Sequence, residues 1–186
     1  MDTIRHHFKP SVAAFAVIVM YSLPHAGWAS ELDTLLKQLR EAEPSEAARI
    51  ERDITREWAK SGSAAMDFLL KRGRDAMDVE AYRSAIEHFT ALTDHAPNFA
   101  EGYHLRAMAY FHLDMLGPAL GDLETVLRLN PDHFGAMRGL AVIFETLDDP
   151  ERALAGYEMV LAVHPHDEEA QKGVERLRNA VRGRDL

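Results

Sequence analysis

Three prolines at a regular interval are the feature of this sequence that most limits its fold. Pro97, Pro131 and Pro165 are spaced 34 residues apart, and each follows a stretch with the apolar spacing of a helix. Self-similarity at a fixed period of this size is typical of repeat proteins, in which each unit is one supersecondary element that stacks on its neighbours. The chain is therefore expected to contain an array of three stacked units.

Small and large residues recur in register with these prolines. Before each proline come an alanine (Ala85, Ala119, Ala153), a large apolar residue (Phe89, Leu123, Tyr157) and a further apolar residue (Leu92, Val126, Val160). Upstream, a small residue recurs at Gly73, Ala107 and Ala141, with an aromatic residue three positions beyond the last two. A small residue lets a neighbouring helix approach closely, while the large residue fills the gap beside it. The pattern predicts two packed helices in each unit.

These positions together resemble the tetratricopeptide repeat (TPR), whose 34-residue pattern is W-x2-L-G-x2-Y, then A-x3-F, then P. The departures are Tyr103 and Met137 in place of tryptophan, Arg72 and Arg106 in place of leucine, and Ala76 in place of tyrosine. The resemblance implies an all-α fold, a right-handed solenoid of helical hairpins. The repeat segment is expected at 64–165, with the three units at about 66–99, 100–133 and 134–167.

The repeat pattern also predicts where individual helices begin and end. The first repeat is expected to have helices at 64–77 and 79–96, and the later helices are expected to begin at Phe99, Pro118, Asp132 and Pro150. Proline is well suited to the first position of a helix, where its missing N–H has no partner to lose. Asp149 is a suitable cap for the helix that starts at Pro150.

A repeat array leaves an apolar face at each end, and the sequence supplies helices to cover both. An apolar stripe within 167–181 (Ala170, Val174, Leu177, Val181) predicts a capping helix in the C-terminal segment 166–186. In segment 30–63, two stripes (Leu32, Leu35, Leu36, Leu39; then Ala47, Ile50, Ile54, Trp58) on either side of Pro44 predict an N-terminal helical hairpin. We expect this hairpin to stack on the first repeat, with a mobile or partner-docking arm as the alternative.

Residues 1–29 have the features of a secretory signal peptide. A basic start is followed by an apolar run at 11–23 and by a small-x-small site that ends at Ala29. The 13-residue run is shorter than the about 20 residues that span a bilayer, so cleavage after Ala29 is favoured over a permanent anchor. The absence of cysteine excludes a disulfide and a lipid-modified cysteine. We expect an exported, soluble protein of the Gram-negative periplasm.

Composition and motifs argue against several functions. Thirty acidic residues against 21 basic ones give a net charge of −9, which disfavours nucleic acid and anionic lipid as partners. No nucleophile with its base and no phosphate-binding loop occurs at motif spacing, so neither catalysis nor a cofactor is expected. His104 and His112 lie about 12 Å apart along one helix, too far for a shared ion, and no metal site is expected. A histidine-based sensor of metals or small molecules is the alternative.

In tetratricopeptide repeats the first helices line a concave groove that receives a peptide or a helix, and the resemblance implies the same groove here. Its candidate residues are Leu70, Lys71, Arg74 and Met77 in the first repeat, His104, Leu105, Met108, Phe111 and His112 in the second, and Arg138, Val142 and Glu145 in the third. The cations Lys71, Arg74 and Arg138 are suited to an acidic or C-terminal segment of a protein partner. The alternative is an ordinary helix surface with salt bridges.

Two glycines and the lack of a known clamp refine this groove hypothesis. Gly135 and Gly139 would leave a hollow beside Arg138, unless they serve close packing against a neighbouring helix. The lysine and asparagine clamp of chaperone-binding members is missing, since its positions carry Leu70, Arg74, Leu105, Gly135 and Gly139. The expected function is a non-catalytic adaptor or scaffold, with an accessory subunit or assembly factor of an envelope or cell-wall enzyme complex as the alternative.

Overall fold

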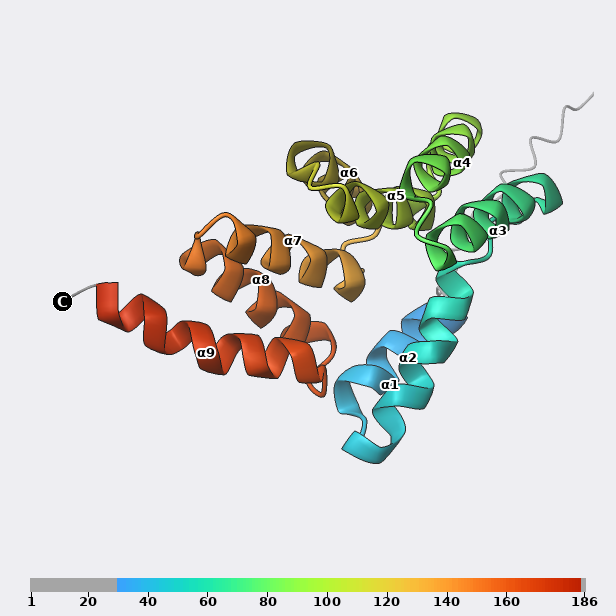
Figure 1. Cartoon of the computed structure of the whole chain (residues 1–186). Helices are drawn as coiled ribbons and strands as arrows, with labels where there is room; N and C mark the ends of the chain where they lie inside the picture. Colours follow the sequence, from blue (N-terminus) through green and yellow to red (C-terminus); the bar gives the residue numbers. More distant parts are fainter. Residues whose placement is uncertain (1–29, 185–186) are drawn as a thin grey trace, which may run out of the picture.

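A computed structural model describes residues 30–184, which form helices joined by short turns (Figure 1). The helices in this range are α1 (Glu31–Glu41), α2 (Pro44–Trp58), α3 (Ala64–Asp78), α4 (Tyr82–His95), α5 (Ala100–His112), α6 (Leu116–Leu129), α7 (Phe134–Thr146), α8 (Pro150–Val163) and α9 (Glu168–Arg184). No strand occurs between residues 30 and 184. The signal peptide expected at 1–29 lies outside the described residues. None of the described helices combines the length and the apolar character that crossing a membrane requires.

The helices confirm the three helical hairpins, α3–α4, α5–α6 and α7–α8, with small differences at their ends. Helix α7 begins at Phe134 rather than Asp132, because Pro131 and Asp132 form a turn. Pro118 is the third residue of α6, not the first as expected. It is tolerated there because the first four N–H groups of a helix have no partner within it. Pro150 does start α8, and Asp149 caps it as expected by accepting from the Arg152 N–H.

The turn inside every hairpin has the same backbone conformation. Glu80, Asp114 and Asp148, spaced 34 residues apart, have φ of 57°, 58° and 55°. The residue after each donates its N–H to a carbonyl five residues back, as Met115 does to Tyr110 at 2.9 Å. This bond, donated by the second residue beyond the C-cap, belongs to the Schellman motif, which reverses the chain sharply. The repeat period is therefore set by the backbone as well as by the packing.

Packing within the hairpins follows the small-and-large register that the sequence predicts. Ala85, Ala119 and Ala153 are all 0% exposed. A Cβ added to Gly73 would lie 2.2 Å from a ring carbon of Phe89, and a Cβ on Gly156 would lie 2.9 Å from that of Ala141. Because real side chains do not approach this closely, these glycines are required for the contact between paired helices.

Helix α9 caps the C-terminal end of the array, as expected. Its buried residues Ala170, Val174 and Leu177 belong to the apolar cluster of α7 and α8. A Cβ on Gly173 would lie 2.6 Å from the Tyr157 ring, so α9 also approaches α8 closely. The outward face of α9 is charged, which gives the end of the solenoid a soluble surface.

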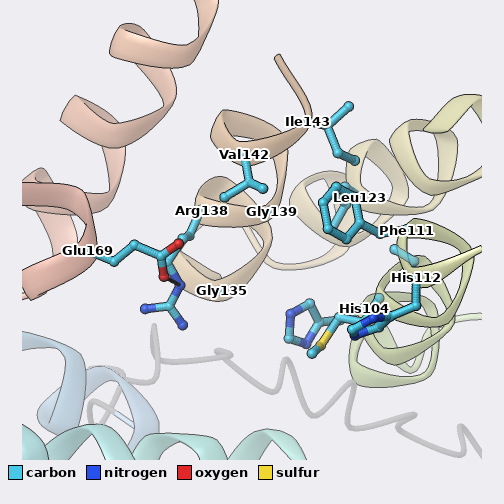
Figure 2. A pocket seen from close by; sticks show the side chains of 12 residues that line it. His104, Phe111, His112, Leu123, Gly135, Arg138, Gly139, Val142, Ile143 and Glu169 are labelled. Atoms are coloured by element: carbon cyan, nitrogen blue, oxygen red, sulfur yellow. Dashed lines mark ion pairs between the residues drawn. The ribbon is translucent and has the colours of Figure 1, made fainter. Parts of the chain in front are cut away.

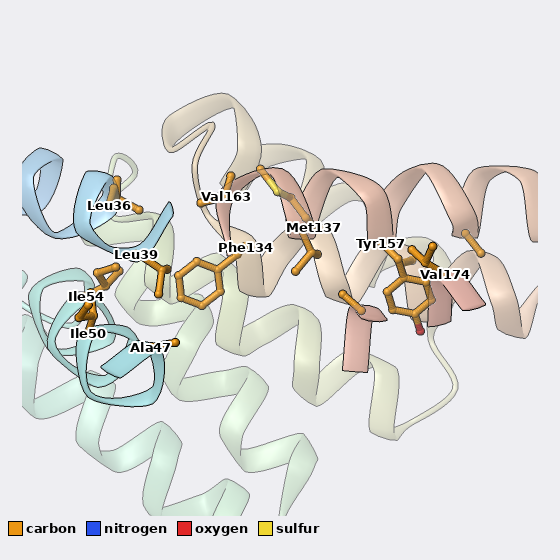
Figure 3. Packing of buried hydrophobic residues seen from close by; sticks show 14 of the residues in the cluster. Leu36, Leu39, Ala47, Ile50, Ile54, Phe134, Met137, Tyr157, Val163 and Val174 are labelled. Carbon is orange, nitrogen blue, oxygen red and sulfur yellow. The ribbon is translucent and has the colours of Figure 1, made fainter. Parts of the chain in front are cut away.

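The N-terminal hairpin α1–α2 does not stack on the first repeat, and this expectation was wrong. Its buried residues, among them Leu39 and Ile54, share one apolar cluster with Phe134 of α7 and Val163 of α8 (Figure 3). Among the described apolar residues of segment 30–63, Ala59, just past α2, is the one that packs on the core cluster of the first repeat. Gly62, with φ of 74°, lies in the turn that leads from this hairpin into α3. The chain thus folds its beginning back onto the third repeat.

Polar contacts join the hairpin to the turns on either side of the third repeat. Arg40 pairs with Asp132 at 2.6 Å, and the His166 ring donates to the Ala42 carbonyl at 3.0 Å. The Trp58 ring, at the end of α2, stacks on the His133 ring at 4.1 Å between centroids. The hairpin therefore lies against the edge of the third repeat where α7 begins and α8 ends.

Candidate functional site

A pocket of about 360 Å³ lies between the first helices of the second and third repeats (Figure 2). Its lining is largely apolar and comes mainly from α5 and α7, with Leu123 of α6 below and Glu169 of α9 at one side. Gly135 and Gly139 lie on the α7 wall, beside Arg138. The hollow that the sequence predicts beside Arg138 is therefore present. Gly139 also serves packing, because a Cβ there would lie 3.1 Å from the Leu123 side chain.

Six of the twelve candidate groove residues line this pocket. They are His104, Met108, Phe111, His112, Arg138 and Val142. Four further lining residues were not among the groove candidates, namely Ala107, Leu123, Ile143 and Glu169. The repeat pattern indicates only packing roles for Ala107 and Leu123. Glu169 was missed because it belongs to the capping helix, whose approach to the groove depends on tertiary packing. These six candidates therefore share one feature, a place in the pocket at the junction of α5, α7 and α9.

The other candidates lie outside the pocket. Leu70 is only 4% exposed, in the core of the first repeat, and Leu105 and Met77 are half-buried against the same core. Lys71 is exposed and pairs with Asp75 at 2.7 Å along one face of α3. Glu145 accepts from the Arg176 guanidinium and the Tyr157 hydroxyl. In the first repeat, Leu70 and Met77 therefore belong to the core, whereas Lys71 lies on the surface.

Each of the three cations expected to receive a carboxylate already has an acidic partner. Besides the Lys71 pair, Arg74 pairs with Glu101 at 2.8 Å. Arg138 pairs with Asp167, whose side chain is 2% exposed, and more loosely with the exposed Glu169 at 3.4 Å. Arg74 is therefore better described as one side of an ion pair between the first two repeats than as a cation that is free to bind a partner in the groove. Arg138 alone combines a place in the pocket with an exchangeable acidic contact.

A buried carboxylate lies next to the pocket and connects α3, α5 and His133, the N-cap residue of α7. Glu101 of α5 is 4% exposed and accepts from Arg74 of α3 through Oε1. Its Oε2 lies 3.2 Å from Nδ1 of His104 and 3.4 Å from Nε2 of His133, the residue before α7. Burial by itself raises the pKa of Glu101, but the hydrogen bonds with the two imidazoles outweigh it and hold that pKa well below its usual range. Glu101 is therefore ionised. We call Glu101 and its partners Arg74, His104 and His133 the hub.

His133, one of the two histidines beside Glu101, is held as a neutral ring. Burial lowers the pKa of His133, against the opposing effect of its hydrogen bond with Glu101. Its Nδ1 accepts the Ala136 N–H at 3.1 Å and so caps α7. Because that nitrogen acts as the acceptor, the ring proton of the neutral form is on Nε2 and points to Glu101.

The comparisons with known proteins agree with this architecture. The family model described as Tetratricopeptide repeat matches residues 119–168. A TPR repeat-containing protein of Rhizobium etli is 30% identical over 177 residues, which cover 95% of this chain and 87% of that protein. The chain belongs to the TPR repeat-containing family.

Solved structures show the same fold over the repeats of this TPR protein. The first TPR of Spaghetti (RPAP3), bound to the HSP90 peptide SRMEEVD, has a TM-score of 0.60 at 26% identity and covers 62% of this chain and 92% of its own. The MamA protein, at 21% identity and a TM-score of 0.60, covers 83% of this chain and 82% of its own. The all-helical TPR solenoid is thereby confirmed.

Proposed function

We propose that this TPR protein is a non-catalytic adaptor whose pocket between α5 and α7 receives an apolar side chain from a peptide or helix of a partner. The observation that carries the proposal is the pocket itself, which is concave, mostly apolar and formed by the first helices of adjacent repeats. The similarity to the first TPR of RPAP3, a structure with a bound peptide, supports this type of ligand.

The lining of the pocket favours an anchor that is apolar and adaptable in shape. Met108 is 41% exposed at its rim, and Phe111 and Val142 form half-buried walls. Methionine has an unbranched, polarisable side chain that adjusts to ligands of different shape. Burying such an anchor removes apolar area from water on both partners, which is the main favourable term in association.

A carboxylate of the partner has one suitable position beside this anchor. Arg138 keeps a buried pair with Asp167, whereas its contact with the exposed Glu169 is longer and exchangeable. An acidic residue or a C-terminal carboxylate on the partner would take the place of Glu169. Arg138 would then hold one internal and one external carboxylate, which sets the orientation of the bound segment.

Met108→Glu is expected to abolish capture of the partner while leaving the fold intact. The substitution places a charge at the mouth of the apolar pocket, on a side chain that is already 41% exposed. The measurement is a crosslinked pull-down from the envelope fraction with the full chain as bait. Met159→Glu on α8 is the matched control, because Met159 is 48% exposed and does not line the pocket. Identical protein bands with both variants would reject the pocket as the binding site.

We further propose that the protein acts in the periplasm after removal of residues 1–29, on the strength of the basic start, the apolar run and the small-x-small site in that segment. The mass of the protein isolated from the envelope is expected to correspond to a chain that begins at Ser30. An intact N-terminus recovered in the membrane would reject this. If the same preparation contains a partner at fixed stoichiometry, the accessory subunit of an envelope complex replaces the transient adaptor.

A further inference from the structure

Three potential metal ligands, two from α5 and one from the turn before α7, come together beside the pocket. The nearest ligand atoms of Glu101, His104 and His133 all lie within 4.8 Å of one another. Two of the residues are one turn apart on α5, and the third precedes α7. We propose that Glu101, His104 and His133 form a binding site for a divalent transition-metal ion, with Zn²⁺ as the preferred ion. This inference is independent of the adaptor function.

Two of the three separations between ligand atoms are close to what zinc requires, and the third, between the two ring nitrogens, is at most 4.8 Å. Zinc bonds to nitrogen and carboxylate oxygen are about 2.0–2.2 Å long in tetrahedral sites, so two ligand atoms on one ion lie about 3.3 Å apart. Oε2 of Glu101 lies 3.2 Å from Nδ1 of His104 and 3.4 Å from Nε2 of His133. An ion would therefore replace two weak hydrogen bonds with coordination bonds after a small adjustment of the rings.

The ligand types and their surroundings favour the same class of ion. Two imidazoles with one carboxylate suit zinc, copper or nickel and disfavour calcium and magnesium, which take oxygen ligands. Arg74 holds the other carboxylate oxygen at 2.8 Å, and Trp58 stacks on the His133 ring. Contacts of this kind fix the orientation of metal ligands. The exposed side of His104 faces the pocket, which provides the entry path.

One hydrogen bond, from the Ala136 N–H to Nδ1 of His133, opposes metal binding. The His133 Nδ1 accepts the Ala136 N–H, so its Nε2 carries the ring proton. Coordination through Nε2 requires that proton to move to Nδ1, which breaks the cap hydrogen bond of α7. The ion therefore binds only if two histidine bonds and one carboxylate bond outweigh the loss of one cap.

The test is a zinc titration of the untagged full chain after treatment with a chelator, followed by isothermal calorimetry. We expect one equivalent to bind with a dissociation constant of about 1 μM or lower, and Co²⁺ to give the absorption bands of tetrahedral coordination. His104→Ala, in a residue whose side chain is 17% exposed, is expected to weaken binding at least about 100-fold. Arg74→Met is expected to weaken it about 10-fold or more through the orientation of Glu101.

His112→Ala is the matched control, because His112 lines the same pocket from α5 but does not belong to the cluster. It should bind zinc as the wild type does, and circular dichroism verifies the fold of each variant. Zinc should also raise the melting temperature of the wild type and of His112→Ala, but not that of His104→Ala. Failure of the wild type to bind one equivalent, or equal binding by His104→Ala and His112→Ala, would overturn the proposal. Neither result affects the capture of a partner tested with Met108→Glu.

Discussion

Glu101→Ala is expected to lower the free energy of unfolding by about 3–5 kcal/mol, the range for removing one partner of a buried ion pair. The substitution leaves three donors without their acceptor, the Arg74 guanidinium and the rings of His104 and His133. Arg74 is 40% exposed and can turn to water, but His133 is 1% exposed and has no such escape. The loss should extend from α3 to α7, since Arg74 lies in α3, His104 in α5 and His133 at the N-cap of α7.

Urea denaturation in the presence of a chelator measures this loss without any contribution from bound metal. Glu124→Ala on α6 is the control, because Glu124 is exposed and a surface change of this kind is expected to stay within about 0.5 kcal/mol. Glu101→Gln should fall between the two, since the amide keeps an acceptor oxygen but loses the charge. Equal midpoints for Glu101→Ala and Glu124→Ala would show that the hub contributes nothing to stability.

The hub occupies a contact register that occurs once between each pair of neighbouring units. Leu70 and Phe99 belong to the same apolar cluster, His104 lies against His133, and Arg138 pairs with Asp167. Each pair is separated by 29 residues and joins the first helix of one unit to the residue just before the first helix of the next. The same geometric position thus holds an apolar pair between the first two units, a histidine pair between the next two, and an ion pair between the third repeat and the start of α9.

This register explains which parts of the candidate site could be predicted from the sequence. The 34-residue period places Leu70, His104 and Arg138 at equivalent positions, so all three were expected to face the groove. The pocket contains His104 and Arg138, but Leu70 is buried. Periodicity identifies equivalent positions on a helix but does not distinguish the edge of a groove from the contact between units. The 29-residue pairing was the available signal that joins His104 to His133.

The fold was largely predictable for the repeats because their contacts are local and recur. The alanine and proline positions specify helices that pack on their sequence neighbours, and the structure confirms those pairs. The N-terminal hairpin was predicted as two helices but was placed wrongly. An amphipathic stripe shows that one face of a helix must be covered. Which surface covers it depends on contacts distant in the sequence, such as that between Arg40 and Asp132, which are 92 residues apart.

Ile54→Ala is expected to destabilise the docked hairpin by about 2–5 kcal/mol, the range for truncating a buried isoleucine to alanine. Ile54 is 0% exposed and belongs to the buried cluster that includes Leu39 of α1 and Phe134 of α7. The cavity should loosen both the packing of α1 on α2 and the contact of the hairpin with the third repeat. The effect is expected to be regional, because the first repeat has a separate apolar cluster.

Hydrogen exchange of the full chain distinguishes this placement from stacking on the first repeat. In Ile54→Ala, amide protection should fall in α1, in α2 and at the start of α7, and should be retained in α4. In a Trp28→Phe background Trp58 is the single tryptophan, and its emission should shift to the red as its stacking on His133 is lost. Thr55→Ala, one position away on the exposed face of α2, should change neither signal. Loss of protection in α3 and α4 instead of α7 would contradict the observed docking. The cavity at Ile54 can destabilise α3 and α4 only if the hairpin packs on the first repeat.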